Sequence, residues 1–277
     1  MTYRELYDWG STQLTEAGIA EASLDARLLL EEVCGTDRGY MLVHGDNPVA
    51  DLQTRTYREY ISHRKSRIPL QHITGYQEFM GLRFRVTEDV LIPRQDTETL
   101  VEEVMRYLHD GMHILDMCTG SGCILLSLLH YSNDCVGVGS DISQKALAVA
   151  KANAESLGKE ATFVQGDLFE SIEGKFDFIV SNPPYIPTKV IETLEAEVKD
   201  HDPISALDGM EDGLYFYRKI VDQAGKYLYP GGMLFFEIGC EQAEDVEKMM
   251  TEAGYHDVTV CKDLSGLDRV VYGTFPG

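Results

Sequence analysis

Apolar residues in the first part of the chain recur at intervals of three and four, which is the spacing of one face of an α-helix. One such series covers residues 6–19 and a second covers residues 24–33, with Ser23 expected as the N-cap of the second helix and Gly35 as its end. A third helix is expected from 51 to about 65. This pattern predicts a small N-terminal helical bundle.

The periodicity then changes from helical to alternating. The segment FMGLRFRVTEDV, residues 79–90, alternates like an exposed hairpin. After it, Asp96 is expected to be the N-cap of a helix with the sequence TETLVEEVMRYL. Phe79 and Arg94 either line the entrance to a cofactor site or pack within this connecting segment.

From residue 96 onward, short apolar segments alternate with helical ones. Alternation of this kind predicts an α/β fold with a doubly wound, mostly parallel, Rossmann-like sheet that binds ligands at the carboxyl ends of its strands. The last two strands are separated only by LSGLD, so we expect them to form an antiparallel hairpin at one side of the sheet. The seven expected strands are HILDMC, VGVGSD, ATFVQGD, FDFIVSN, GGMLFFEIG, DVTVCKD and RVVYGTF.

The chain therefore divides into three expected parts. Residues 1–75 form the helical domain, residues 76–95 form a β-hairpin linker, and residues 96–277 form the α/β domain. A chain of 277 residues is long enough to contain one large α/β core and a smaller helical one.

The formal net charge of −22 works against attraction to a phosphate backbone, so we expect no direct nucleic-acid partner. Residues 55–67 are an exception, because they hold five Arg or Lys residues and one acid, Glu59. That basic segment is either a solvated helix face or a docking surface for a macromolecular partner.

Six cysteines are scattered along the chain without a C-x-x-C pair or a neighbouring histidine at ligand spacing. Neither a metal site nor a disulfide framework is expected from them. The N-terminal MTYRELYDWG carries acids and lacks an apolar core, and no apolar run reaches the roughly 18 residues of a membrane helix. These features predict a cytoplasmic protein with no membrane partner.

A glycine-rich turn follows the first strand of the α/β domain, in the sequence Asp116-Met-Cys-Thr-Gly120-Ser-Gly122. Glycines at this point let the backbone approach a nucleotide closely. An acid at the end of the second strand, Asp141, is placed to bind ribose hydroxyls, and Asp167 ends the third. Each acid could instead be an ordinary cap or turn former. The candidate cofactor-binding residues are Asp116, Cys118, Thr119, Gly120, Ser121, Gly122, Asp141, Ile142, Asp167, Leu168 and Asn182.

The kind of nucleotide follows from what is missing. A dinucleotide site needs a third glycine where this chain has Leu125, and no Gly-Lys-Ser/Thr follows for a triphosphate. An adenosine with a charged, phosphate-free tail fits instead, with its ammonium near Asp116 or nearby carbonyls, its ribose on Asp141 and its adenine beside Asp167 and Leu168. That description matches S-adenosylmethionine, whose product is S-adenosylhomocysteine.

The fourth strand ends in Ser181-Asn182-Pro183-Pro184-Tyr185. The prolines cannot donate to a β-ladder and hold the backbone extended, so this segment can present fixed carbonyl groups. The Asn182 side chain and the Pro183 carbonyl offer two acceptors, and the Tyr185 ring offers a face for a flat group. We interpret residues 182–185 as a catalytic receptor for an NH2 group, and the alternative is a Pro-Pro turn that merely ends the strand.

Together, Asp-x-x-x-Gly-x-Gly, the acid after the second strand and Asn-Pro-Pro-Tyr resemble the class I methyltransferases that modify planar nitrogens. The segments IPLQHITGYQEF, VLIPRQDTETLVE and VSNPPYIP resemble the bacterial peptide chain release factor glutamine methyltransferases over nearly the whole chain. That resemblance implies an N-terminal substrate-recognition domain and a seven-stranded methyltransferase domain. It also implies methyl transfer to the glutamine amide nitrogen in the Gly-Gly-Gln motif of class I release factors. Cys118 stands where the family usually has glycine.

Other functions stay open at this stage. An Asn-Pro-Pro-Tyr site also suits an exocyclic amino group of a nucleic-acid base, and a ribosomal-protein glutamine is a further acceptor. Residues 190–212 hold eight acids and one lysine, which we expect to repel a polyanion. A third possibility is a cofactor-binding assembly factor that transfers no methyl group.

Overall fold

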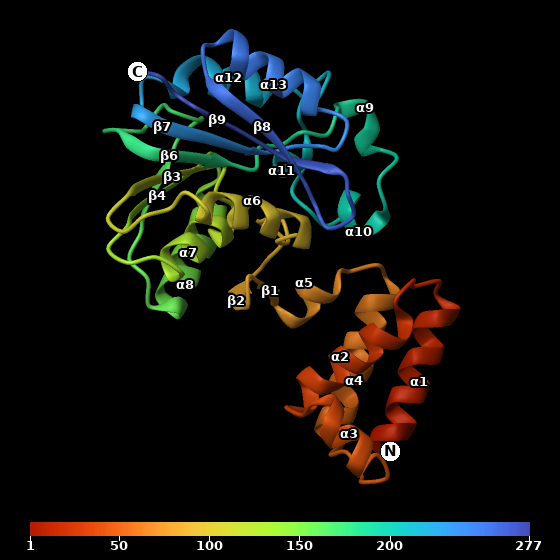
Figure 1. The fold of residues 1–277 in the computed structure, drawn as a ribbon. Helices are drawn as coiled ribbons and strands as arrows, with labels where there is room; N and C mark the ends of the chain where they lie inside the picture. The colour runs from red at the N-terminus through yellow and green to blue at the C-terminus, as the bar shows by residue number, and fades with distance from the viewer. The chain divides into compact units, whose positions relative to one another are not determined.

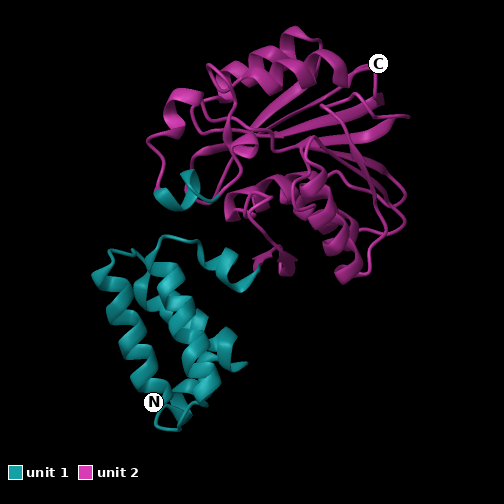
Figure 2. Cartoon of the chain, turned by 180° about the vertical axis from the view of Figure 1, so that it is seen from behind, with its two compact units in different colours: residues 1–75, 196–201 teal, residues 76–195, 202–277 magenta.

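The computed structural model describes residues 1–277, and the chain divides into two compact units. Unit 1 consists of Met1–Gly75 and Ala196–His201, and unit 2 consists of Tyr76–Glu195 and Asp202–Gly277. In Figure 2 this second segment of unit 1 is the short teal stretch whose two ends continue into unit 2. Unit 1 is therefore not continuous in sequence.

Unit 1 is all-helical. Its first helix begins with a capping box, in which the Thr2 hydroxyl accepts from the Glu5 N–H and the Glu5 carboxylate accepts from the Thr2 N–H. The second helix ends at Gly35 in the left-handed conformation, as predicted, but it begins at Ala22 and not after Ser23. The helices are α1 (Tyr3–Glu16), α2 (Ala22–Cys34), α3 (Arg38–His44), α4 (Asp51–Lys65), α5 (Leu70–Thr74) and α10 (Ala196–Lys199).

The predicted cap at Ser23 is wrong because that hydroxyl lies inside α2 and hydrogen-bonds with the Ser11 hydroxyl at 2.9 Å. The predicted third helix coincides with α4, whereas the short helix α3 was not predicted. Apolar side chains of α1, α2 and α4 form the core of unit 1, and the Tyr57 hydroxyl at its centre donates to the Ala26 carbonyl.

The basic segment 55–67 is partly internal. Arg64 is buried and donates to Asp25 at 2.7 Å and to Glu197 at 3.2 Å, and Arg67 also pairs with Glu197. These pairs join α2 and α4 to α10 within unit 1. Arg64 therefore stabilises the interior of unit 1, and its buried side chain is not part of a docking surface on this segment.

Unit 2 begins with a short hairpin of β1 (Tyr76–Phe79) and β2 (Leu82–Arg85). The hairpin begins earlier and is shorter than the predicted range of residues 79–90. Val86 and Val90 lie outside it, because they pack in a separate buried cluster. Phe79 is also buried, in the core beneath the sheet, so it does not line a cofactor entrance.

The helix α6 (Gln95–Met105) follows this hairpin. Its N-cap is Arg94, which makes no side-chain cap, so the predicted cap at Asp96 is wrong. Asp96 lies in the first turn, where its charge suits the helix dipole, and it pairs with Arg269 at 3.3 Å.

A seven-stranded sheet forms the centre of unit 2, as predicted, in the order β5-β4-β3-β6-β7-β9-β8. The first five strands in this order are parallel, and β9 pairs antiparallel with both of its neighbours. The antiparallel hairpin of β8 and β9 at one side is therefore confirmed. The strands are β3 (His113–Met117), β4 (Val136–Asp141), β5 (Thr162–Gln165), β6 (Phe176–Ser181), β7 (Leu228–Glu237), β8 (His256–Lys262) and β9 (Asp268–Thr274).

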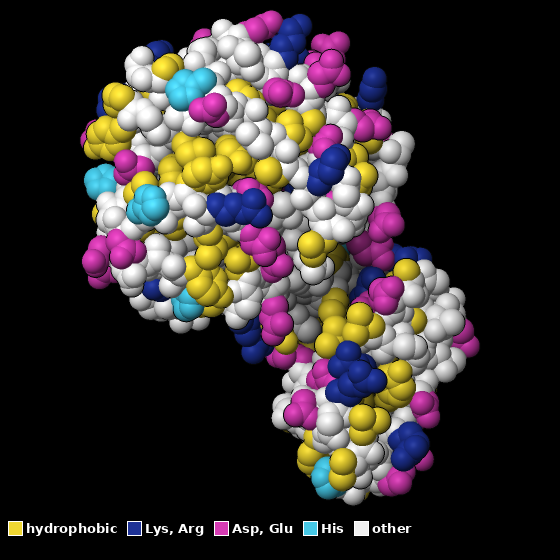
Figure 3. Space-filling model, in the orientation of Figure 1, with side chains coloured by type: hydrophobic (Ala, Val, Ile, Leu, Met, Phe, Trp, Pro, Cys, Tyr) yellow, Lys and Arg dark blue, Asp and Glu magenta, His cyan; other side chains and the backbone are white.

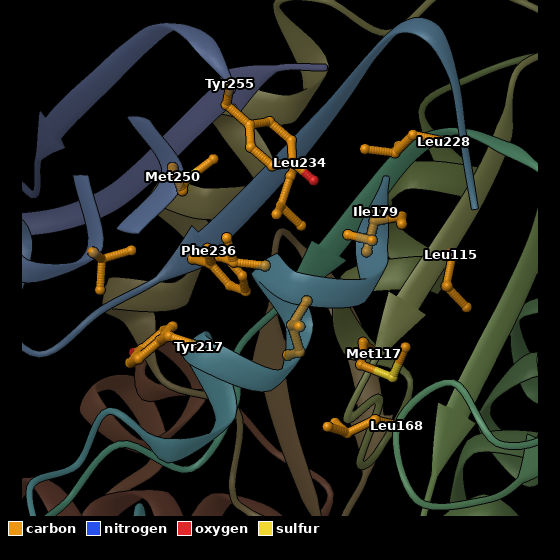
Figure 4. Close-up of a cluster of buried hydrophobic side chains, with 14 of the residues drawn as sticks. Leu115, Met117, Leu168, Ile179, Tyr217, Leu228, Leu234, Phe236, Met250 and Tyr255 are labelled. Atoms are coloured by element: carbon orange, nitrogen blue, oxygen red, sulfur yellow. The ribbon is translucent and has the colours of Figure 1, made fainter. Parts of the chain in front are cut away.

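Helices cover both faces of this sheet (Figure 1). Successive residues of a strand point to opposite faces, so Ile179 packs with the helices α12 and α13 while Phe178 and Val180 pack with α6, α7 and α8. Figure 4 shows the first of these two cores. The remaining helices are α7 (Cys123–His130), α8 (Gln144–Leu157), α9 (Thr188–Ile191), α11 (Ile204–Leu207), α12 (Tyr215–Ala224) and α13 (Ala243–Glu252).

The surface carries charges of both signs. On the face shown in Figure 3, acidic side chains are scattered over both units among Lys and Arg. All six cysteines are free thiols. No helix combines the length and the hydrophobicity that crossing a bilayer would require.

Candidate active site

A cavity of about 410 Å³ lies at the carboxyl ends of β3, β4, β5 and β6. Its lining includes residues 118–121, 141–143, 166–168, Asn182 and Pro184, which follow these four strands directly or end them. Parallel strands place their carboxyl ends at one edge of a sheet, so segments distant in sequence meet there. The glycine turn and the Asn-Pro-Pro-Tyr motif therefore border a single cavity.

The glycine turn brings backbone to the cavity wall. Gly120 adopts φ +54° and lines the cavity, and a Cβ added to it would meet no atom within 4 Å. The backbone there consequently borders open space that a ligand can occupy. Cys118 precedes it at φ +61°, a left-handed conformation that is uncommon for a side-chain-bearing residue, and Cys118 is also among the residues that line the cavity.

Asp116 lies behind the turn and does not line the cavity. Its side chain is completely buried, and its Oδ2 accepts a 2.6 Å hydrogen bond from the Thr119 hydroxyl, whereas Oδ1 has no partner. Burial raises the pKa of Asp116 to about 7. In this structure the carboxyl supports the turn from the protein interior.

Asp141 holds the end of β4 against the glycine turn. Its Oδ2 accepts from the Gly120 N–H at 2.9 Å and its Oδ1 accepts from the Ser143 N–H at 2.8 Å. Burial raises the pKa of Asp141, and the backbone donors oppose that rise. Each oxygen keeps a lone pair for a hydroxyl in the cavity.

Apolar side chains line another part of the cavity. Ile142 is 60% exposed although it is apolar, and Leu168 is buried at φ +52° beside the exposed Asp167. All three residues line the cavity. An exposed isoleucine and a strained leucine at one cavity are consistent with contacts to a flat, apolar ring.

In the Asn-Pro-Pro-Tyr motif, Asn182 and Pro184 line the cavity, whereas Pro183 and Tyr185 lie outside the lining. The Asn182 Nδ2 donates to the Thr97 hydroxyl at 3.4 Å. Its Oδ1 accepts no hydrogen bond from the protein, so the amide has an acceptor available at the cavity.

The backbone of Tyr185 is held by a loop that sequence reasoning missed. Gln242 donates through Nε2 to the Tyr185 carbonyl at 3.0 Å and to the Gly213 carbonyl at 3.2 Å. Gly213 has φ +77°, and a Cβ there would lie 2.3 Å from the Tyr185 oxygen. The glycine pair in GMEDG, residues 209–213, was the available signal for this close approach.

Residues 203–206 form another part of the lining that was not predicted. They follow Asp202, whose buried carboxylate forms an ion pair with Arg94. Arg94 also lines the cavity, which agrees with the first of the two interpretations of this residue given above. Three of the eight acids in residues 190–212 form ion pairs with arginine, namely Glu197, Asp202 and Asp212. The fold therefore neutralises part of the charge that was expected to repel a polyanion.

No group of three or more His, Cys, Asp or Glu side chains is arranged to hold a metal ion. The residues that meet at the cavity are instead a backbone turn, one carboxylate, apolar side chains and an amide. That combination suits a ligand with an uncharged ring and ribose hydroxyls, together with a substrate N–H group that donates a hydrogen bond to the amide oxygen.

Solved structures resemble this chain in fold. A methyltransferase from Pyrococcus furiosus aligns with a TM-score of 0.57 at 20% identity, over 78% of this chain and 99% of its own. A T. thermophilus 16S rRNA N2 G1207 methyltransferase, solved with AdoMet and guanosine, aligns with a TM-score of 0.53 at 17% identity, over 72% of this chain and 49% of its own. These similarities support the methyltransferase fold of unit 2.

Sequence comparisons identify the family. Residues 5–75 match the PrmC N-terminal domain, and residues 95–197 match the methyltransferase small domain. A release factor glutamine methyltransferase from Geobacter sulfurreducens is 44% identical over 273 residues, covering 98% of this chain and 96% of its own. The enzyme of that name from Clostridium acetobutylicum is 42% identical over 89% of both chains. The chain belongs to the release factor glutamine methyltransferase family.

Proposed function

We propose that this chain transfers a methyl group from S-adenosylmethionine to the side-chain amide nitrogen of the glutamine in the Gly-Gly-Gln motif of class I peptide chain release factors. The observation that carries the proposal is the meeting of the glycine turn and the Asn182 amide at one cavity. Membership of the family agrees with this substrate class.

The cavity fits the cofactor. Gly120 leaves open space against its backbone, Asp141 keeps lone pairs for ribose hydroxyls, and Ile142 presents an apolar side chain for the adenine. Asp167 and Leu168 complete the adenine side, and residues 118–122 would run along the methionine tail. When bound, S-adenosylmethionine supplies an electrophilic methyl group on a sulfonium.

The residues 182–185 have to make an amide nitrogen reactive. That nitrogen is a poor nucleophile because its lone pair is delocalised into the carbonyl group. Asn182 Oδ1 can accept one N–H of the substrate and the Pro183 carbonyl the other, which increases electron density on nitrogen and directs it. Orientation of the reacting group and fixed dipoles of this kind lower the activation free energy of enzymatic reactions by several kcal/mol.

The remaining motif residues would shape the acceptor side. Pro184 lines the cavity, and we assign it contact with the glutamine side chain. Tyr185 is half-buried with its backbone fixed by Gln242, and its ring would stack against the flat amide. After transfer, the N-methylated amide cation is acidic enough to lose its proton to water, so no residue needs to act as a base.

We assign substrate recognition to the helical domain, residues 1–75, with residues 76–95 as the linker and residues 96–277 as the methyltransferase domain. A release factor is a large protein, and a separate helical module suits contacts beyond the methylated glutamine. The partner takes part in translation, which places the proposed activity in the cytoplasm.

The test is incubation of the purified chain with labelled S-adenosylmethionine and a purified class I release factor. Intact mass and peptide mapping should find one methyl group on the glutamine of Gly-Gly-Gln. A release factor with that glutamine replaced by asparagine is the matched control and should stay unlabelled.

Parallel incubations with ribosomal RNA and with ribosomal proteins separate the other functions. Label in either of them, with none in the release factor, would contradict the proposal. Binding of the cofactor without transfer to any of these acceptors would favour the assembly-factor hypothesis.

A further inference from the structure

A short segment, residues 203–206, forms one side of the cavity. It comprises the N-cap and most of α11, which is a helix of a single turn. Ile204 is 51% exposed although it is apolar, so a ligand in the cavity would cover an apolar side chain. A one-turn helix has too few hydrogen bonds to persist by itself, so its position depends on the groups that hold its two ends.

The carboxyl end of this segment is joined by backbone hydrogen bonds to the chain that follows the Asn-Pro-Pro-Tyr motif. The Ile186 N–H, directly after the motif, donates to the Leu207 carbonyl at 3.0 Å, and the Gly209 N–H donates to the Ile186 carbonyl at 2.8 Å. The Leu207 side chain is buried. That end of the segment is therefore fixed without help from charged side chains.

The amino end of the segment is held by an ion pair. Asp202, which directly precedes the segment, has a completely buried side chain, and its Oδ2 accepts from the Arg94 Nη2 at 2.5 Å. Arg94 is the N-cap residue of α6, and its carbonyl accepts from the Thr97 N–H at 3.1 Å. A hydrogen bond between two ionised groups is stronger than one between neutral groups. The pair therefore joins residues 203–206 to the first turn of α6.

We propose that Arg94 and Asp202 are positioning residues for the cofactor, and that their ion pair keeps residues 203–206 closed over the cavity, as in this structure. Asp202 does not line the cavity, so it acts on a ligand only through Arg94 or through the segment. This inference rests on the cofactor in the proposed function and is independent of the acceptor. A segment that is held before binding costs less to order, so the pair should increase cofactor affinity.

Asp202→Asn tests the pair, because it removes the charge and keeps the shape of the side chain. Loss of a charge-assisted hydrogen bond should shift the equilibrium between the closed and open segment by about tenfold. The Kd for S-adenosylhomocysteine, measured by calorimetry, should rise by about the same factor, since only the closed segment covers the ligand. This ligand has no sulfonium charge, so removal of the carboxylate charge does not act on it through that group.

Two further measurements separate positioning from other roles. The Asp208 N–H donates to the Ile204 carbonyl at 2.9 Å within α11. In the ligand-free Asp202→Asn variant this amide should exchange with solvent about tenfold faster, because the released helix frays. In the release factor methylation assay the KM for S-adenosylmethionine should rise about tenfold with kcat within about twofold, because the Asn182 amide is untouched.

Arg94→Gln removes the other partner, and this side chain is 42% exposed, so the variant decides the question if Asp202→Asn does not fold. It should also raise the Kd for S-adenosylhomocysteine by about tenfold. Since both residues act through one ion pair, the Arg94→Gln/Asp202→Asn double variant should bind little more weakly than the worse single variant. Arg94→Lys keeps a cation and should bind more tightly than Arg94→Gln.

Asp46→Asn is the matched control, because Asp46 forms an exposed ion pair with Arg4 in unit 1. Its Kd should stay within about twofold of the wild-type value. The inference is overturned if either single variant of the pair keeps the wild-type Kd, if the Kd rises without faster exchange at Asp208, or if the two single losses multiply in the double variant. A wild-type chain that binds no cofactor overturns this inference together with the proposed function, whereas cofactor binding without methylation of the release factor overturns the proposed function alone.

Discussion

The buried carboxyl of Asp116 should make the stability of unit 2 depend on pH, and Asp116→Asn should remove that dependence. Asp116 is completely buried behind the glycine turn, and its pKa is raised from 3.8 to about 7. The folded state therefore binds a proton that the unfolded state has already released between these two pH values. The stabilisation is fully present below about pH 4 and is lost as the pH rises through about 7.

The size of the effect follows from the two pKa values. A difference of about three units corresponds to roughly 4 kcal/mol over the whole range. Between pH 5 and pH 8 the wild type should lose about 2.5 kcal/mol of unfolding free energy through this residue. Asparagine carries no titratable proton, so the unfolding free energy of the Asp116→Asn variant lacks this loss. The stability of the variant should therefore increase relative to that of the wild type as the pH rises.

Urea unfolding of both proteins at pH 5, 6, 7 and 8 measures this difference. The far-UV circular dichroism signal follows both units, whereas the fluorescence of Trp9, the only tryptophan, follows unit 1 alone, so a shift in the first signal without one in the second reports on unit 2. The fluorescence transition is consequently an internal control that should not differ between the two proteins. Glu237 has a similarly raised pKa, but it is present in both proteins and its contribution cancels. Parallel pH curves for the two proteins would refute the reasoning.

Three further predictions concern other parts of the chain. Asn182→Ala removes the hydrogen-bond acceptor at the cavity and should lower kcat about 100-fold in an activity assay. The cofactor Kd, measured by calorimetry, should stay within about threefold, and equal losses of kcat and of cofactor affinity would contradict the role assigned to Asn182. Gly213→Ala places a Cβ against the motif backbone and should cost about 2 kcal/mol more in urea unfolding than Gly231→Ala. Gly231 is the control because it has a similar positive φ and no atom within 4 Å of an added Cβ, so equal costs would exclude the clash. Arg64→Ala breaks buried ion pairs and should lower the stability of unit 1 by about 3 kcal/mol. Arg4→Ala, at an exposed pair, should change it by less than about 1 kcal/mol, and similar values for the two variants in Trp9 fluorescence would contradict this assignment.

Local signals predicted the elements that depend mainly on local pattern. The helix α4 coincides with its predicted range, Gly35 ends α2, and the seven strands form the predicted sheet. Each of these rests on periodicity or on a backbone conformation that glycine adopts at little cost. The same holds for the glycine turn and for the prolines that end β6.

Caps and packing partners were predicted less well because they depend on distant residues. The Ser23 hydroxyl is used by Ser11, and Asp96 pairs with Arg269 from the other end of unit 2. The sequence allowed Phe79 to line the entrance of a cofactor site, but this side chain lies in the core beneath the sheet. No local pattern distinguishes these outcomes.

The sequence by itself determined the order of helices and strands and the two motifs of the candidate site, because hydrophobic spacing and proline and glycine constraints act over a few residues. Only the tertiary structure decided which side chains stand behind those motifs. Thr97, in the first turn of α6, and Asn182, which follows β6, are far apart in sequence and hydrogen-bond only because the fold packs these two elements together. Burial of Asp116 and Glu237 likewise arises from long-range packing, and it is this desolvation that raises their pKa values.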